Sequence, residues 1–185
     1  MKLTDALTGR RSVREFLPDP LPRELLQELA EAAVNAPSHM NLQPWAFVAV
    51  TDPAVVAQAG AAAKQYLLRT IGRDSPFYGE RAALAQPHYE MFYNAPALML
   101  VCATQAGALA DYGCVMAAHS LMLAAHAMGL GSCWVSQAQP WLDSADGRRA
   151  LKLAPEQRPV APLLLGYPVA PPQSPGRFRP PLRFV

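Results

Sequence analysis

The sequence predicts one domain of the α/β or α+β class, in which helices cover a sheet. Its 185 residues are the usual size of a single domain. Hydrophobic residues make up 51% and charged residues only 16%, which excludes general disorder and favours burial of some apolar surface against a second subunit. Segments with helical spacing of apolar residues alternate with short apolar runs of strand length, the pattern of a covered sheet.

The first third of the chain begins with two predicted helices. Thr4 is expected to cap a short helix that Gly9 ends, because glycine tolerates the left-handed conformation after a last turn. Residues 10–16 follow as an extended run. After a proline-rich connector, residues 22–36 form a helix, since leucine and alanine recur at helical spacing opposite glutamates.

The middle of the chain alternates strands and helices. Residues 45–50 predict a short buried strand and residues 54–68 a helix. Turn-forming residues make 69–79 a loop. We expect a second helix over 80–93, kinked at Pro87 because proline lacks the backbone donor.

Three further inner strands are predicted at residues 97–103, 132–136 and 160–165. Between the first two lies a central helix over 111–128. The apolar run around that helix, residues 112–130, is long enough for a membrane span, but its two histidines and its serine favour a buried core helix.

Residues 1–167 are expected to form the domain and residues 168–185 a separate extended tail. The tail holds six prolines in eighteen residues and therefore lacks the donors for an inner strand. Arginines alternate there with apolar residues, so the tail is expected to pack on the domain or on a partner subunit. These residues are Arg177, Phe178, Arg179, Leu182, Arg183 and Phe184.

Charge and cysteine content limit the possible partners and location. The net charge of +2 is too balanced for a nucleic-acid or membrane-surface binder. Seven basic residues and one acidic residue lie after residue 147, which indicates a local anion site. Three separated cysteines favour neither a disulfide framework nor a zinc site. The N-terminus has no signal-peptide core, and a reduced, cytoplasmic location is expected.

Arg10, Ser12 and Arg14 share one face of the extended run. Two guanidinium groups and a hydroxyl suit a terminal phosphate, which guanidinium planes bind in bidentate fashion. The alternative is a solvated basic patch paired with Glu15 and Asp19, and spacing alone leaves the two readings even.

Two more segments are suited to a flat ligand. Between two prolines, the side chains and amides of Ser38, Asn41 and Gln43 are free for a planar, polar-edged molecule, unless they only satisfy a local turn. The second segment follows the central helix, which two glycines end. Trp134 lies at the end of the strand after them, where its indole can either border a flat aromatic ligand or pack in the core.

Four blocks of this sequence, in order, resemble the nitroreductase family of flavin enzymes. They cover residues 10–16, 36–45, 129–134, and 165–168 together with 179–182. The resemblance extends over nearly the whole chain. No Gly-x-Gly-x-x-Gly fingerprint is present, so a Rossmann dehydrogenase is not expected.

The resemblance implies an α+β fold with a central, mostly antiparallel sheet covered by helices, in an intertwined homodimer with FMN at the subunit interface. It implies an oxidoreductase that passes a hydride from NAD(P)H through flavin N5 to a nitroaromatic, quinone or similar small acceptor by a ping-pong mechanism. The flavin performs this chemistry, so no catalytic side chain and no metal site are expected.

Carried over by position, the family's cofactor contacts fall on four groups of residues. The phosphate and ribityl end would be held by Arg10, Arg11, Ser12 and Arg14, with Arg179 or its rival Arg177. The ring would be approached by Pro37, Ser38, Asn41 and Gln43 of the partner subunit and by Trp134, Val135, Ser136 and Gln137.

This sequence departs from the family pattern at Ser136 and Gln137, where many members have an acidic residue or a glycine pair. One of Phe77, Tyr78, Tyr89, Phe92 and Tyr93 is a candidate lid over the flavin. Two alternatives stay open: a flavin-binding or sensing dimer without turnover, and a reductase specialised for one metabolite.

Overall fold

The fold is seen in a computed structural model that describes residues 1–173 and 176–185. Four strands form one antiparallel sheet in the order β1-β2-β4-β3. This arrangement confirms the predicted α+β class. The strands are β1 Trp45–Val50, β2 Ala97–Ala103, β3 Gly131–Trp134 and β4 Arg158–Gly166.

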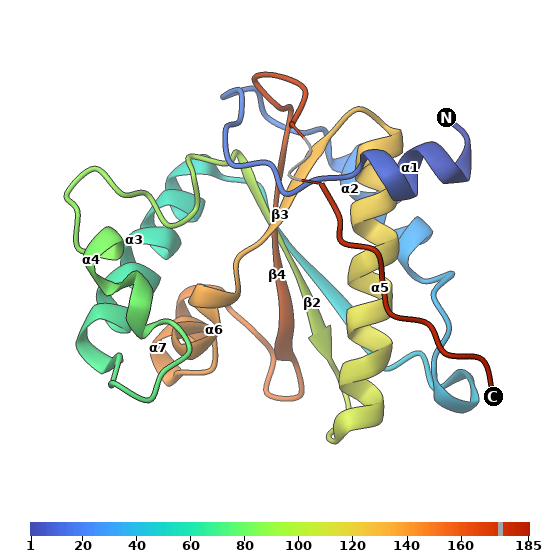
Figure 1. The fold of residues 1–185 in the computed structure, drawn as a ribbon. Coiled ribbons are helices and arrows are strands. Elements are labelled where there is room, and N and C mark those ends of the chain that lie inside the picture. Colours follow the sequence, from blue (N-terminus) through green and yellow to red (C-terminus); the bar gives the residue numbers. More distant parts are fainter. Residues whose placement is uncertain (174–175) are drawn as a thin grey trace.

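Helices cover both faces of the sheet (Figure 1). On one face lie α1, α2 and α5, and on the other lie α3, α4, α6 and α7. The α-helices are α1 Leu3–Gly9, α2 Arg23–Ala33, α3 Pro53–Thr70, α4 Arg81–Leu84, α5 Ala108–Ala127, α6 Gln139–Leu142 and α7 Ala145–Ala150. The described residues also contain short 3-10 helices: η1 His39–Asn41, η2 Tyr78–Glu80 and η3 Ser136–Ala138.

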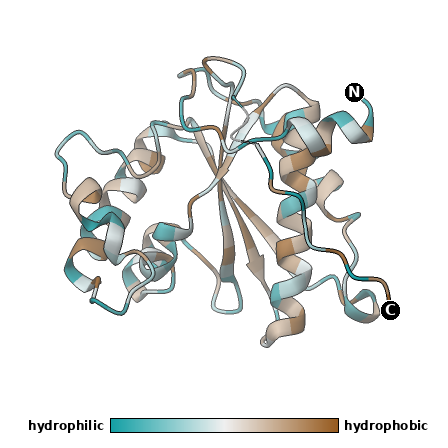
Figure 2. Ribbon diagram, in the orientation of Figure 1, coloured by the Kyte–Doolittle hydropathy of each residue, from teal (hydrophilic) through white to brown (hydrophobic). Residues whose placement is uncertain are grey.

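The central strand β2 is buried along its whole length and divides the core in two. Leu98 and Leu100 pack towards α3, whereas Met99 and Val101 pack towards α2 and α5. Successive side chains of a strand point to opposite faces, so an uninterrupted apolar run is what two covered faces require. Strand β2 is accordingly apolar along its length in the colouring of Figure 2.

The strands match the predictions more closely than the helix ends do. Residues 45–50 and 97–103 are strands as predicted, although β1 lies at the sheet edge and is only partly buried in the single chain. The helix predicted to 36 ends at Ala33. Thr4 is not the cap of α1: the helix begins at Leu3 and Lys2 is its N-terminal cap residue. The backbone N–H of Lys2 donates to the carboxylate of Asp5.

The prediction of a helix over residues 80–93 is wrong. Only α4 is α-helical there, and turns follow from Ala85 to Asn94. Met91 and Phe92 are both buried in the core, while Lys64 of α3 donates to the carbonyls of Gln86 and Tyr89. Tertiary contacts of this kind fix an irregular path that helical propensity does not foresee.

One helix of the described residues, α5, is long and apolar enough to cross a membrane by length and composition. One face of it is buried against the sheet and α2, as the sequence predicted. The opposite face carries Leu109, Tyr112, Val115 and Met116, which are 38–61% exposed in the single chain. The helix is therefore only partly a core helix within one subunit.

The C-terminal tail is extended and has no helix or strand among its described residues. The tail prediction also covers residues 174 and 175, which lie outside the described part of the chain. Phe178 is 101% exposed, and Leu182 and Phe184 are also exposed. These side chains do not pack on their own domain.

Candidate functional site

The extended segment 10–16 is attached to the edge of the sheet beside β3. The backbone N–H of Val13 donates to the carbonyl of Ser132 at 2.9 Å, and Ser12 forms a parallel bridge with Ser132. Further along, Leu17 donates to the Tyr167 carbonyl at 2.8 Å. The sequence prediction of an extended run is confirmed, and the run carries its arginines to the start of β3.

Arginines from both ends of the chain meet at this segment. The pKa of Arg10 is lowered, first by burial and then by the nearby charges of Arg177 and Arg11. Ion pairs join Arg149 to Asp146 and Arg158 to Asp111, in other parts of the structure. Glu15 and Asp19 form no ion pair within the described residues, so pairing does not explain the basic patch.

This arrangement fits the phosphate of FMN. A bound anion stabilises a partly buried guanidinium that has like charges beside it. A phosphate monoester supplies nearly two negative charges and several acceptor oxygens. Arg10, Ser12 and Arg14 are the donors that would hold it, and Arg177 is the tail arginine that the structure brings near Arg10. No interaction of Arg179 with Arg10 is seen within residues 1–173 and 176–185.

The end of β3 adjoins an open cavity of about 700 Å³. Trp134 and Ser136 line it together with Asp111, Gln139 and Arg158. Val135 is 1% exposed, its side chain packs in the core and its backbone N–H donates to the carbonyl of Pro162, so Val135 does not line this cavity. An indole and a hydroxyl beside a cavity of this size suit a flat aromatic ring.

The Gln137 side chain is held by an unforeseen partner. Its amide donates to the carboxylate of Glu80 in η2. This bond ties the segment after β3 to the segment before α4. Glu80 was not among the predicted site residues, because the contact spans 57 positions of the chain and leaves no local sequence signal.

The loop from Pro37 to Gln43 has an unusual backbone. Met40, Asn41 and Gln43 all have positive φ, at 47°, 56° and 47°. Positive φ is uncommon for residues other than glycine, and strained conformations concentrate at functional sites. The Ser38 hydroxyl accepts from the backbone N–H of Gln43 at 2.9 Å, as a local turn would. Asn41 and Gln43 themselves are exposed.

Within one chain this loop does not reach the basic patch. It lies beside Gly113 of α5, where an added Cβ would meet Pro44 at 3.1 Å. The N-terminal segment lies beside His126, near the other end of the same helix. Thirteen helical residues separate these two positions by about 20 Å. The residues predicted for one flavin site thus lie apart in the single subunit.

Within residues 1–173 and 176–185, no group of three or more His, Cys, Asp or Glu side chains is placed to hold a metal ion. The three cysteines are free and buried. Burial raises the pKa of Cys114 to about 11 and that of Cys102 to about 12, so both thiols stay protonated at neutral pH.

Comparison with known proteins tests the resemblance to the nitroreductase family. The model of the nitroreductase family matches residues 7–167, most of the chain. The chain belongs to the nitroreductase family. The family resemblance seen in the sequence motifs is thereby confirmed.

Similar proteins of this family have different activities. The 5,6-dimethylbenzimidazole synthase of Rhodospirillum rubrum is 34% identical over 172 residues, which cover 86% of this chain and 78% of that protein. A nitroreductase with bound FMN from Bacteroides fragilis has a TM-score of 0.83 and 25% identity, covering 100% of this chain and 99% of its own. An iodotyrosine deiodinase with FMN and 3-iodo-L-tyrosine has a TM-score of 0.76 and 26% identity, with the same coverage.

Segment 10–16 approaches the sheet closely at Gly131. A Cβ on Gly131 would lie 2.8 Å from both Cβ and Cγ1 of Val13. Gly131→Ala is therefore expected to push the arginine segment away from β3 and to lower the free energy of unfolding by about 1–3 kcal/mol, as overpacking does. Urea unfolding would measure this.

The control is Gly79→Ala, where no atom lies within 4 Å of the added Cβ. Adding Val13→Ala to Gly131→Ala removes the close Cγ contacts and should recover part of the lost stability. If the two glycine variants are equally stable, Val13 does not restrict the segment as described.

Proposed function

We propose that this protein is an FMN-dependent oxidoreductase that passes a hydride from NAD(P)H to a nitroaromatic, quinone or similar small acceptor by a ping-pong mechanism. The observation that carries the proposal is the cluster of Arg10, Arg11 and Arg177 beside β3, in a chain of the nitroreductase family. Bound FMN supplies the two-electron chemistry at N5. The protein residues bind and orient it, so no protein nucleophile is needed.

The proposed contacts follow the chain from the phosphate to the ring. Arg10, Arg11, Ser12 and Arg14, with Arg177 or Arg179, hold the phosphate and ribityl end. Trp134, Val135, Ser136 and Gln137 border the ring, and Pro37, Ser38, Asn41 and Gln43 approach it from the partner subunit. Support for the ring position comes from the cavity at the end of β3.

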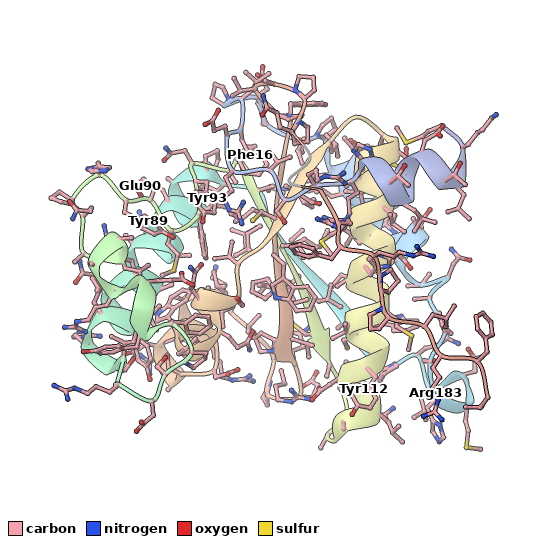
Figure 3. The ribbon with its side chains drawn as sticks, viewed as in Figure 1. Phe16, Tyr89, Glu90, Tyr93, Tyr112 and Arg183 are labelled. Atoms are coloured by element: carbon pink, nitrogen blue, oxygen red, sulfur yellow. The ribbon has the colours of Figure 1, made fainter. Side chains whose placement is uncertain are left out.

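We further propose that the protein is a homodimer, which the exposed apolar face of α5 supports. Tyr112 lies on that face (Figure 3), in line with Leu109 and Met116 at helical spacing. The exposed side chains of the tail and the open edge of β1 offer further surface. A partner also explains how the loop at 37–43 joins a flavin site that its own chain cannot complete.

The dimer is tested by light scattering on the purified protein. We expect a molar mass of about twice the 20.0 kDa of one chain. A particle of 20.0 kDa that still binds FMN would contradict a site shared between subunits.

Turnover is tested by mixing the FMN-loaded protein anaerobically with NADPH and, separately, with NADH. Bleaching of the flavin absorption band, followed by its return when a quinone or nitroaromatic compound is added, is the expected result. Absence of bleaching with both donors would instead support a flavin-binding or sensing protein without turnover.

The natural acceptor belongs to a broad class of small molecules, since the relatives include a nitroreductase, a synthase and a deiodinase. A stopped-flow panel of acceptors against the reduced protein would rank them. A cytoplasmic location is proposed as well, because the three cysteines are free and buried.

A further inference from the structure

A row of charged and aromatic side chains connects α3 to the arginine segment. Lys64 of α3 lies 5.8 Å from the ring of Tyr89, and the rings of Tyr89 and Tyr93 meet edge to face at 6.3 Å. The guanidinium of Arg14 lies over the ring of Tyr93, 5.9 Å from its centroid. Tyr89 and Tyr93 lie together on the connecting segment in Figure 3.

The far end of this row is fixed. Besides facing Tyr89, the Lys64 ammonium donates to the carbonyls of Gln86 and Tyr89 at 2.9 and 2.8 Å. The hydroxyls of Tyr89 and Tyr93 are 3.5 Å apart. Burial, followed by this contact, raises the pKa of Tyr89, so its phenol stays neutral. The row is thus built on a helix that is itself packed on the sheet.

The backbone also holds Tyr93 in one direction. Tyr93 and Asn94 have φ of 50° and 52°, two consecutive left-handed residues without a glycine. On one side Met91 and Phe92 are buried, and on the other Ala95 is buried just before β2. Such a conformation persists only where the surrounding structure determines it, and it often marks a functional site.

Arg14 would gain from such a support. It is exposed, and an exposed arginine side chain loses rotamer freedom when it binds a ligand. An aromatic face within about 6 Å attracts the guanidinium and restricts it before any ligand arrives. Restriction in advance strengthens binding because less freedom is lost in the complex.

We propose that Tyr93 is a positioning residue for Arg14, holding its guanidinium where the flavin monophosphate binds. The proposal rests on the proposed FMN site and adds a residue that the family motifs did not indicate. Tyr93 acts through Arg14, so its effect on FMN must disappear when Arg14 is absent.

The test is a double-mutant cycle on the dissociation constant for FMN, measured by quenching of flavin fluorescence. Tyr93→Asn removes the ring but suits the left-handed backbone, which asparagine tolerates. We expect it to raise the dissociation constant about 3- to 20-fold, the range of cation–π contacts. In an Arg14→Ala background the same change should have an effect below about twofold, because the partner is gone.

Two variants separate this role from a general structural one. Tyr93→Phe keeps the ring and should restore FMN binding to within about threefold of wild type, the difference between aromatic faces. Tyr66→Asn makes the same substitution on a partly buried tyrosine of α3 outside the proposed site and should leave FMN binding unchanged. Equal effects of Tyr93→Asn with and without Arg14, or no effect at all, would overturn the proposal.

A second measurement needs no flavin and no Tyr93 variant. In NMR spectra of the FMN-free wild-type protein, side-chain protons of Arg14 should be shifted upfield by the Tyr93 ring. Resonances at ordinary arginine positions would refute the contact even if FMN binds. A wild-type protein with shifted Arg14 resonances that fails to bind FMN would refute the proposed function, and with it the role of Tyr93 in that function.

Discussion

Replacing Arg10 and Arg14 together by alanine is expected to raise the dissociation constant for FMN by roughly 10²- to 10⁴-fold. Each lost charge-assisted hydrogen bond is worth about 1.5–3 kcal/mol, and about 1.4 kcal/mol corresponds to a tenfold change. Folding should be unaffected or slightly favoured, because the pKa of Arg10 is lowered by burial and by the charges of Arg177 and Arg11.

The matched control is Arg69→Ala with Arg149→Ala, which removes the same charge from exposed positions outside the proposed site. Isothermal titration with FMN measures both double variants, and thermal unfolding of the FMN-free proteins reports on the fold. If both pairs of substitutions weaken FMN binding equally, the loss reflects net charge, and the phosphate assignment to Arg10 and Arg14 is wrong.

Gly147→Ala is expected to cause the largest loss of stability from a single methyl group. A Cβ at Gly147 would lie 2.1 Å from the carbonyl oxygen of Trp141 and 3.1 Å from Cα of Leu142. These are backbone atoms of the buried segment around α6, so α7 must move away from α6. We expect a loss of about 3 kcal/mol or more, at the upper end of overpacking.

Thermal unfolding of the FMN-free protein measures this effect, and a loss of that size in a domain of this length lowers Tm by roughly 6–12 °C. Gly72→Ala is the comparison, since no atom lies within 4 Å of a Cβ at that position. A Gly147→Ala protein that unfolds with the wild type would show that α6 and α7 pack less closely than described here.

Strands were easier to predict than the connecting segments, for a physical reason. β2 is covered on both faces, so every one of its residues is apolar and its limits are visible in the sequence. The path of residues 85–94 depends instead on hydrogen bonds from Lys64, which lies far from this segment in the sequence. It also depends on the burial of Met91 and Phe92, which no local sequence pattern indicates.

The candidate site likewise contains residues that a local sequence pattern indicates and residues that only the tertiary fold brings together. Arg10, Ser12 and Arg14 were identified because an extended segment places alternate residues on one face, and the bridge of Ser12 to Ser132 bears out the extended form. Glu80 and Tyr93 were not identified as partners of site residues. Their contacts with Gln137 and Arg14 arise from the tertiary fold alone.

A crystal structure of the protein grown with excess FMN tests the proposed shared flavin site most directly. We predict a phosphate bound by Arg10 and Arg14 with an arginine of residues 177–179, and a flavin ring at the end of β3 in contact with Asn41 or Gln43 of a second subunit. A flavin bound wholly within one subunit, or a phosphate away from the N-terminal arginines, would contradict it.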